Sequence, residues 1–149
     1  KRERVELTLR GNTPTLERSK PVAGDEPVPD PLCVWSAAWR AVISSPAVEA
    51  KLNLLFVGSA DNNLYAIDIR NGREAWHFET QGQVTLSPAV HHGAGYFGSV
   101  DHFVYAVDVA TGKLRWKFRS GGPVISSPAI VNNVVYVGSM DHHLYALTA

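Results

Sequence analysis

The chain has 149 residues, of which 45% are hydrophobic, and its formal net charge is zero. This length suffices for one domain with a real core, and the balanced charge argues against a nucleic-acid or anionic-membrane partner. No apolar run is long enough to insert into a membrane. Because the chain starts at Lys1 without a methionine, we expect a processed protein or a segment of a longer one. A cytoplasmic and a periplasmic location both fit.

Residues 1–31 differ from the rest of the chain, because they are rich in charge and hold five of its nine prolines. Apolar and polar residues alternate over 4–10 (RVELTLR), which predicts a half-buried strand; a solvated tail is the alternative. The proline-rich stretch 20–31 has the character of an extended linker. Cys33 is the only cysteine, so it forms no internal disulfide, and its apolar neighbours predict a buried packing thiol.

From residue 32 onward the sequence repeats itself three times with a period of 40 residues. The three copies span about 42–78, 84–118 and 124–147. A two-residue insertion in the first copy lies in the stretch AVEAKLNLLFVGS. The columns that repeat most clearly are Gly58, Gly98 and Gly138, then Asp61, Asp101 and Asp141, then Trp76 and Trp116.

Each copy contains about four short segments rich in Val, Ile, Tyr, Phe and Trp, separated by turn residues. This composition favours β-strands, and the recurring prolines and glycines would interrupt any long helix. A repeat of about 40 residues with four antiparallel strands is typical of one β-propeller blade. We therefore predict an all-β fold of three four-stranded propeller blades over 32–149, which is an incomplete ring.

Specific roles follow for the repeated residues around each turn. The alanine pairs a small side chain with the tyrosine on the opposite face of its strand, the aspartate accepts hydrogen bonds from turn N–H groups, and the glycine tolerates positive φ. The tryptophan four residues later is predicted to be a wedge between blades. These structural residues are Ala66, Asp68, Gly72 and Trp76 in the first copy, and Ala106, Asp108, Gly112 and Trp116 in the second.

The patterns AxDxxxGxxxW and GSxDxxxYA resemble the pyrroloquinoline-quinone-type propeller repeat, known for its tryptophan-docking motif. The resemblance covers about 118 of the 149 residues in three copies. It implies that each Trp docks between adjacent blades. Because the motif is scaffolding, it implies the fold and does not imply the quinone.

The sequence offers little for catalysis. The related quinoprotein dehydrogenases use calcium bound by Glu, Asn and Asp, a catalytic Asp and two adjacent cysteines, and this chain lacks the cysteine pair. His102 and His142 align with Asn62, which indicates a polar turn position and no metal ligand. No histidine is spaced to activate the serines before the repeated prolines. We therefore expect no catalytic, cofactor-binding or metal-binding residues.

The third copy stops where its outermost strand should begin, while 32–36 (LCVWS) has the spacing of such a strand before the first copy. This arrangement predicts a ring clasp, in which 32–36 completes a third blade. Three blades cannot close a ring, so we expect open faces at both ends, and association with a second copy or with blades from another chain or segment.

We conclude from the sequence that the chain is a non-enzymatic propeller module for protein or ligand binding, as a sensor or scaffold within a larger protein or assembly. Two alternatives remain. One is a fragment of a quinone-dependent dehydrogenase, which reconstitution with quinone and calcium would reveal. The other is a glycan-binding propeller, which a sugar array would reveal.

Overall fold

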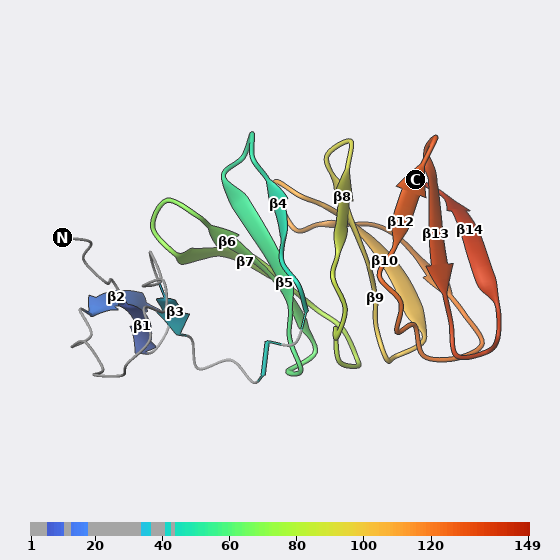
Figure 1. Ribbon diagram of the computed structural model, residues 1–149, viewed down its shortest axis with the longest axis horizontal. Helices are drawn as coiled ribbons and strands as arrows, with labels where there is room; N and C mark the ends of the chain where they lie inside the picture. Colours follow the sequence, from blue (N-terminus) through green and yellow to red (C-terminus); the bar gives the residue numbers. More distant parts are fainter. Residues whose placement is uncertain (1–5, 11–12, 18–33, 37–40, 43) are drawn as a thin grey trace, which may run out of the picture. The chain divides into compact units, whose positions relative to one another are not determined.

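The computed structural model describes residues 6–10, 13–17, 34–36, 41–42 and 44–149. This part of the chain is built from β-strands and turns (Figure 1), and it contains no helix long and apolar enough to cross a membrane. The chain divides into two compact units, Lys1–Ala38 and Trp39–Ala149. The expected segment boundary between residues 31 and 32, and Cys33, lie outside the described residues.

The first unit contains one small sheet with the strand order β2-β1-β3. Its strands are β1 (Glu6–Arg10), β2 (Thr13–Glu17) and β3 (Val34–Ser36). β1 lies within the segment 4–10, where alternation predicted a strand; it pairs antiparallel with β2 and parallel with β3. β3 is part of the segment expected to be a clasp. In this structure β3 lies beside β1. That it completes a third blade as a clasp remains a prediction.

The second unit consists of three antiparallel sheets, which are the three predicted propeller blades. Blade one has the order β4-β5-β6-β7 and blade two has β8-β9-β10-β11. Their strands are β4 (Ala47–Glu49), β5 (Leu54–Gly58), β6 (Asn63–Asp68), β7 (Arg73–Glu79), β8 (Ala89–His91), β9 (Ala94–Gly98), β10 (Phe103–Asp108) and β11 (Leu114–Arg119). Blade three has three strands, β12 (Ala129–Val131), β13 (Val134–Gly138) and β14 (Leu144–Thr148).

The two-residue insertion of the first repeat lengthens one hairpin turn. Four residues separate β4 from β5, ending in Asn53 with a φ of 54°. Two residues, His92 and Gly93, make the corresponding turn of blade two, and both have positive φ. Because loops absorb insertions with little effect on the strands they join, both blades keep the same four-strand order.

The core lies between the blades rather than within one sheet. Phe56 and Leu64 of blade one pack against Phe97 and Tyr105 of blade two. Tyr96 and Ala106 of blade two pack against blade three in the same way. Blade two therefore buries one face against blade one and the other against blade three, and Figure 1 shows the three sheets succeeding one another in chain order. The interface between blades is the feature that positions the repeated residues.

Candidate functional site: the interface between blades

The glycine that ends the second strand of a blade allows close contact with the next blade. A Cβ atom at Gly58 would clash with the backbone oxygen of Val84, and one at Gly98 would clash with the side chain of Val124. Both valines are buried. Gly138 occupies the same column in blade three, but a Cβ there would meet nothing closer than Ser126 Oγ at 3.5 Å. The glycine column is thus a socket for a valine from the following blade, and the socket of blade three is empty among the described residues.

Trp76 joins blade one to blade two. Its Nε1 donates a hydrogen bond to the Val109 carbonyl oxygen at 3.1 Å, and its indole lies so close to Gly112 that a Cβ there would be 2.7 Å from the ring. The indole also packs on Phe56, with ring centroids 5.6 Å apart. Gly112 has a φ of 71°, so this glycine both makes its own turn and receives the Trp of the preceding blade. Its second role was missed in the sequence analysis.

Trp116 occupies the same place between blades two and three. Its ring packs on Tyr96, with centroids 5.8 Å apart, and it also packs against the clusters that contain Val135 and Val137 of blade three. Trp116 and Trp76 are both half-buried. The two tryptophans are therefore arranged as interblade wedges and not as exposed platforms for a ligand.

The aspartates before the turns cap backbone N–H groups. Asp68 accepts from the N–H of Arg70 at 2.9 Å, and Asp108 accepts from Thr111 at 3.0 Å. Both carboxylates also accept from an arginine, and hydrogen bonding to the Arg70 guanidinium lowers the pKa of Asp68 to about 2. Gly72 follows in the first turn, with a φ of 69°. Ala66 and Ala106 are both fully buried on the strands before these turns.

Asp101 and Asp141 belong to the second column of repeated aspartates. Each accepts hydrogen bonds from a tyrosine side chain, from a turn and from the segment that leads in from the preceding blade. Asp101 accepts from Tyr105 Oη at 2.7 Å and from the N–H of Phe103 at 3.0 Å. It also accepts at 3.0 Å from the N–H of Gln81, in the segment that leads from blade one to blade two. Asp141 repeats this arrangement with Tyr145 and the N–H of Gly121. Burial, reinforced by the Asp101 hydrogen bond, raises the pKa of Tyr105 above its ordinary value.

Asp61 forms the corresponding bond within blade one, where Tyr65 Oη donates to it at 2.8 Å. Burial is again the largest cause of the raised pKa of Tyr65, followed by the hydrogen bond to Asp61. The Tyr–Asp pair therefore recurs in all three blades. Spacing alone could have suggested it, since Tyr follows Asp by four residues in every copy.

Four buried hydroxyls were also missed in the sequence analysis: Ser59, Thr80, Ser99 and Ser120. Thr80 Oγ1 lies 2.8 Å from the Asn62 carbonyl oxygen and 2.6 Å from that of Gly82. Ser99 Oγ donates to the Gly82 carbonyl oxygen at 3.0 Å. Because buried polar groups require partners, these hydroxyls satisfy the backbone where the chain passes between blades. The sequence signal for Ser59 and Ser99 is their place directly after the repeated glycines Gly58 and Gly98.

Three of the histidines, His92, His102 and His142, have positive φ values, while His77 and His91 lie in strands β7 and β8. His102 and His142 have φ values of 75° and 71°, and the aligned Asn62 has 75°, so this column needs a residue that tolerates the left-handed region. His91 Nε2 lies 3.1 Å from Asn133 Oδ1. Within the described ranges, no group of three or more His, Cys, Asp or Glu residues is placed to hold a metal ion.

The residues that the structure describes do not fit a quinone and its calcium ion. The repeated aspartates already bind tyrosine hydroxyls, turn N–H groups or arginines, as the distances above show. Cys33 lies outside the described residues, and the chain has no second cysteine to form the adjacent pair.

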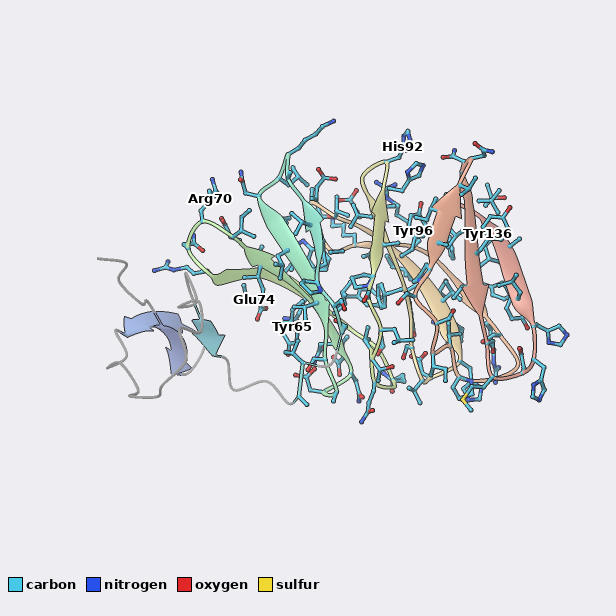
Figure 2. All side chains as sticks on the ribbon, viewed as in Figure 1. Tyr65, Arg70, Glu74, His92, Tyr96 and Tyr136 are labelled. Carbon is cyan, nitrogen blue, oxygen red and sulfur yellow. The ribbon has the colours of Figure 1, made fainter. Side chains whose placement is uncertain are left out.

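Blade three presents an open face, which we define as Tyr136, Gly138, Leu144 and Ala146. Leu144 is 74% exposed, whereas its repeat equivalents Leu64 and Val104 are 0% exposed. Tyr136 is 38% exposed, whereas Tyr96 is 3% exposed; Figure 2 shows these two tyrosines on neighbouring blades. Ala146 is also exposed. The equivalent surface is buried in blades one and two and is exposed in blade three.

The face of blade one that points away from blade two is less exposed than the open face of blade three. Val42 is 47% exposed, while the aligned Val84 is 0% exposed, as expected for an uncovered end. Val57 and Tyr65, however, which point to the same side of blade one, are 4% and 7% exposed. The large open face expected at both ends is therefore found at blade three among the described residues.

A family model described as outer membrane protein assembly factor BamB matches the chain twice, over residues 33–98 and 84–149. No curated protein matches the chain. Among solved structures, BamB from Moraxella catarrhalis is 16% identical with a TM-score of 0.65, over 73% of this chain and 35% of that one.

Two further solved structures are quinohemoprotein alcohol dehydrogenases. The ADHIIG enzyme from Pseudomonas putida HK5 is 25% identical with a TM-score of 0.60, over 67% of this chain and 17% of that one. The enzyme from Comamonas testosteroni is 22% identical with a TM-score of 0.61, over 74% and 20%. The chain thus spans about a third or less of the length of the solved structures it matches, and these likenesses establish the shared propeller fold.

Proposed function

Because the chain belongs to the outer membrane protein assembly factor BamB family, whose model matches residues 33–149, we propose that it is a non-enzymatic binding and scaffold module for protein partners. In this proposal the blades are a rigid platform within a larger protein or assembly, of the kind that the family name describes for outer membrane proteins. The partner is protein, with no part for nucleic acid or membrane insertion.

The observation that carries the proposal is the open face of blade three. Contiguous exposed apolar side chains on a folded domain usually mark an interface, and Leu144 is 74% exposed in a column that is otherwise fully buried. A blade also offers backbone groups at its edge strand, which favours pairing with another chain. Both features point to a macromolecular partner rather than to a small substrate.

The described residues form a much weaker site for a small ligand than for a protein. One open groove lies between the β4–β5 and β8–β9 turns, and it is lined by Glu49, Lys51, Leu52, His92, Gly93 and Val109. A typical ligand site is an enclosed, mostly apolar cavity with a few converging polar groups. This groove is open and has only one acid and one base, so it supports no specific chemistry.

The test of the binding function is photo-crosslinking at defined positions. A photoreactive residue replaces Leu144 on the open face, and the matched control replaces Val48 of blade one, which is 54% exposed. Purified chain is irradiated alone and with an outer-membrane protein fraction. We expect a discrete protein adduct from position 144 and a much weaker one from position 48. Equal, diffuse labelling from both positions would contradict the proposal.

The second candidate function is a fragment of a quinone-dependent dehydrogenase, because the chain shares its propeller fold with two quinohemoprotein alcohol dehydrogenases, although the described aspartates are already engaged in other bonds. The purified chain is incubated with pyrroloquinoline quinone and calcium, and cofactor absorbance and dye-linked alcohol oxidation are measured. A known quinohemoprotein alcohol dehydrogenase treated in the same way is the positive control. Stoichiometric quinone bound to the chain, with turnover, would replace the scaffold proposal by this one.

A further inference from the structure

The outermost strand of blade two, β11, carries a strip of positive charge that the repeat does not require. We define this basic strip as Arg115, Lys117 and Arg119, which alternate along β11 and are all exposed. The strand contains no acidic residue. In blade one, the positions equivalent to Lys117 and Arg119 are occupied by His77 and Glu79 of β7. The basic strip is therefore a property of blade two and not of the propeller architecture.

Two cations of the basic strip have no acidic partner. Arg115 donates to the Asp108 carboxylate at 2.9 Å, whereas neither Lys117 nor Arg119 forms an ion pair with any described residue. Lys117 Nζ lies 4.8 Å from the centroid of the Phe103 ring, a cation–π contact that holds the ammonium group on this face. Because neighbouring like charges repel each other, an anionic partner would be bound favourably here.

β11 also has a free backbone edge. It is the end strand in the order β11-β10-β9-β8, and blade three follows it in the chain, so this edge belongs to a complete blade. The N–H of Ser120 donates to the His102 carbonyl oxygen at 2.9 Å, so the backbone of Ser120 points toward β10. Because backbone groups of successive residues in an antiparallel strand point to opposite sides, those of Lys117 and Arg119 point outward. A neighbouring strand would find two N–H and two C=O groups in place.

Charged side chains on an edge strand also prevent uncontrolled pairing with other chains. That protective role needs charge but does not need one sign. The edge strand of blade one, β7, shows this, since Glu74 and His77 pair with each other at 2.6 Å and Glu79 is a further acid on the same strand. A strip of one sign repels basic segments and favours acidic ones. The basic strip therefore favours selection of a partner over protection alone.

We infer that β11 binds, by strand addition, an extended protein segment in which acidic residues alternate with apolar ones. The segment runs antiparallel to β11, with one carboxylate opposite Lys117 and another opposite Arg119. Residues directly opposite each other in an antiparallel pair share a face, so the carboxylates meet the cations while the two backbones form a ladder. The apolar residue between them lies on the face of Trp116 and Phe118. This second surface goes beyond the open face of blade three and rests on the proposed function only in taking a protein partner.

The test is a nuclear magnetic resonance titration of the full isotope-labelled chain with a short peptide in which Glu and Val alternate. We expect saturable shifts centred on the backbone amides of Lys117 and Arg119. Hydrogen exchange of these two amides should slow, because each enters a hydrogen bond with the peptide. The amides of His77 and Glu79, on the equivalent strand of blade one, should not change.

Two modified peptides of equal charge separate strand addition from attraction to any polyanion. Methylation of the Glu backbone nitrogens removes the N–H groups that would face β11, whereas methylation of the Val backbone nitrogens removes those that would face away from it. We expect the first peptide to bind about tenfold or more weakly than the second. Equal binding of the two would contradict strand addition and would indicate a general polyanion site, such as one for nucleic acid.

Charge variants of the chain test the two cations. Lys117→Glu combined with Arg119→Glu should weaken the unmodified peptide about tenfold or more, because two attractive cross-strand pairs become repulsive. The matched control, Lys51→Glu combined with Arg73→Glu, makes the same change in net charge at other exposed positions and should leave binding unchanged. Circular dichroism and melting show whether each variant is folded, and the single variants Lys117→Gln and Arg119→Gln serve if the double variant is not.

Two further results would overturn the inference. One is the absence of saturable shifts at Lys117 and Arg119, and the other is binding that is unchanged in the double charge variant. Either would leave the basic strip as protection of an edge. Neither result bears on photo-crosslinking at position 144, so failure of this inference and failure of the proposed function are distinguishable.

Discussion

Trp76 of blade one lies against Gly112 of blade two, and its Nε1 donates to the carbonyl oxygen of Val109 at 3.1 Å. The two residues are 36 positions apart and belong to successive copies of one motif. Gly112 therefore receives the tryptophan of the preceding copy of the motif. This relationship holds the blades together in series and leaves the last blade with unused contacts.

Replacing Trp76 with Ala should lower the free energy of unfolding by about 3–5 kcal/mol, the usual range for a large aromatic side chain in a core. Trp116→Ala should cost less by about 1 kcal/mol, because no described residue accepts a hydrogen bond from its Nε1, as Val109 does from Trp76. Urea denaturation followed by circular dichroism measures both. A loss below about 1 kcal/mol for Trp76→Ala would show that the indole is not a wedge.

The glycine column offers a matched pair of substitutions. Gly98→Ala should destabilise the chain by about 1–3 kcal/mol, because the added methyl group overlaps the buried side chain of Val124. Gly138→Ala should be neutral or stabilising by about 0.4–1 kcal/mol, because its socket is empty and alanine restricts the unfolded chain. Thermal melting of the two variants measures the difference. Equal losses for Gly98→Ala and Gly138→Ala would mean that the column serves only the local turn.

The Tyr–Asp pairs predict an alkaline transition. Burial, and then the hydrogen bond to Asp101, raise the pKa of Tyr105 above the ordinary value of 10.0. Because the folded pKa lies above the unfolded one, this contribution to stability is complete below about pH 10 and is lost as the pH rises through the folded pKa. The near-ultraviolet absorbance of tyrosinate should therefore show a delayed class of tyrosines.

Asp101→Asn is the control for this transition, since it removes the negative charge and keeps the side chain's size. The pKa of Tyr105 should then move back toward 10.0 without reaching it, because burial is the larger cause of the shift. An unchanged titration curve in this variant would show that the carboxylate does not act on the tyrosine.

The histidines are predicted to hold no metal ion. His102 and His142 serve left-handed turns, and the described residues contain no cluster of ligands. Elemental analysis of chain purified without a histidine tag should find less than one equivalent of zinc, nickel or copper. A stoichiometric ion that is removed by a chelator and returns on titration would refute this prediction.

The sequence predicted the blades because every copy must repeat the same contacts at the same period. The turn roles of Asp68, Asp108, Gly72 and Gly112 are local, so the pattern of each turn was sufficient to predict them. The contacts between copies were harder to predict. Nothing in one repeat indicates that Gly112 receives Trp76, or that Asp101 accepts from the N–H of Gln81.

The exposure of individual side chains could not be predicted from the sequence either. Leu64 and Leu144 are the same residue in the same column, yet one is fully buried and the other is 74% exposed. The difference depends only on whether a following blade is present. The face at blade one was expected to be as open as that of blade three. Among its described residues, Val42 is exposed, while Val57 and Tyr65 are buried.

The clasp is tested by deletion. If residues 32–36 supply the outermost strand of a third blade in a second copy, removing 1–36 should sharply weaken association of the chain with itself. Analytical ultracentrifugation of the full and shortened chains at matched concentrations compares them. Association that is the same with and without these residues would leave β3 as a partner of β1 alone.

The most direct test of a blade three open to another protein chain is the mass of the purified 149-residue chain by light scattering across micromolar concentrations. We predict a mass above the monomer's 16.3 kDa that rises with concentration, and a return to the monomer mass for Leu144→Asp, whose exposed position tolerates the charge. A compact wild-type monomer that melts cooperatively at every concentration, with Leu144→Asp indistinguishable from it, would contradict this account.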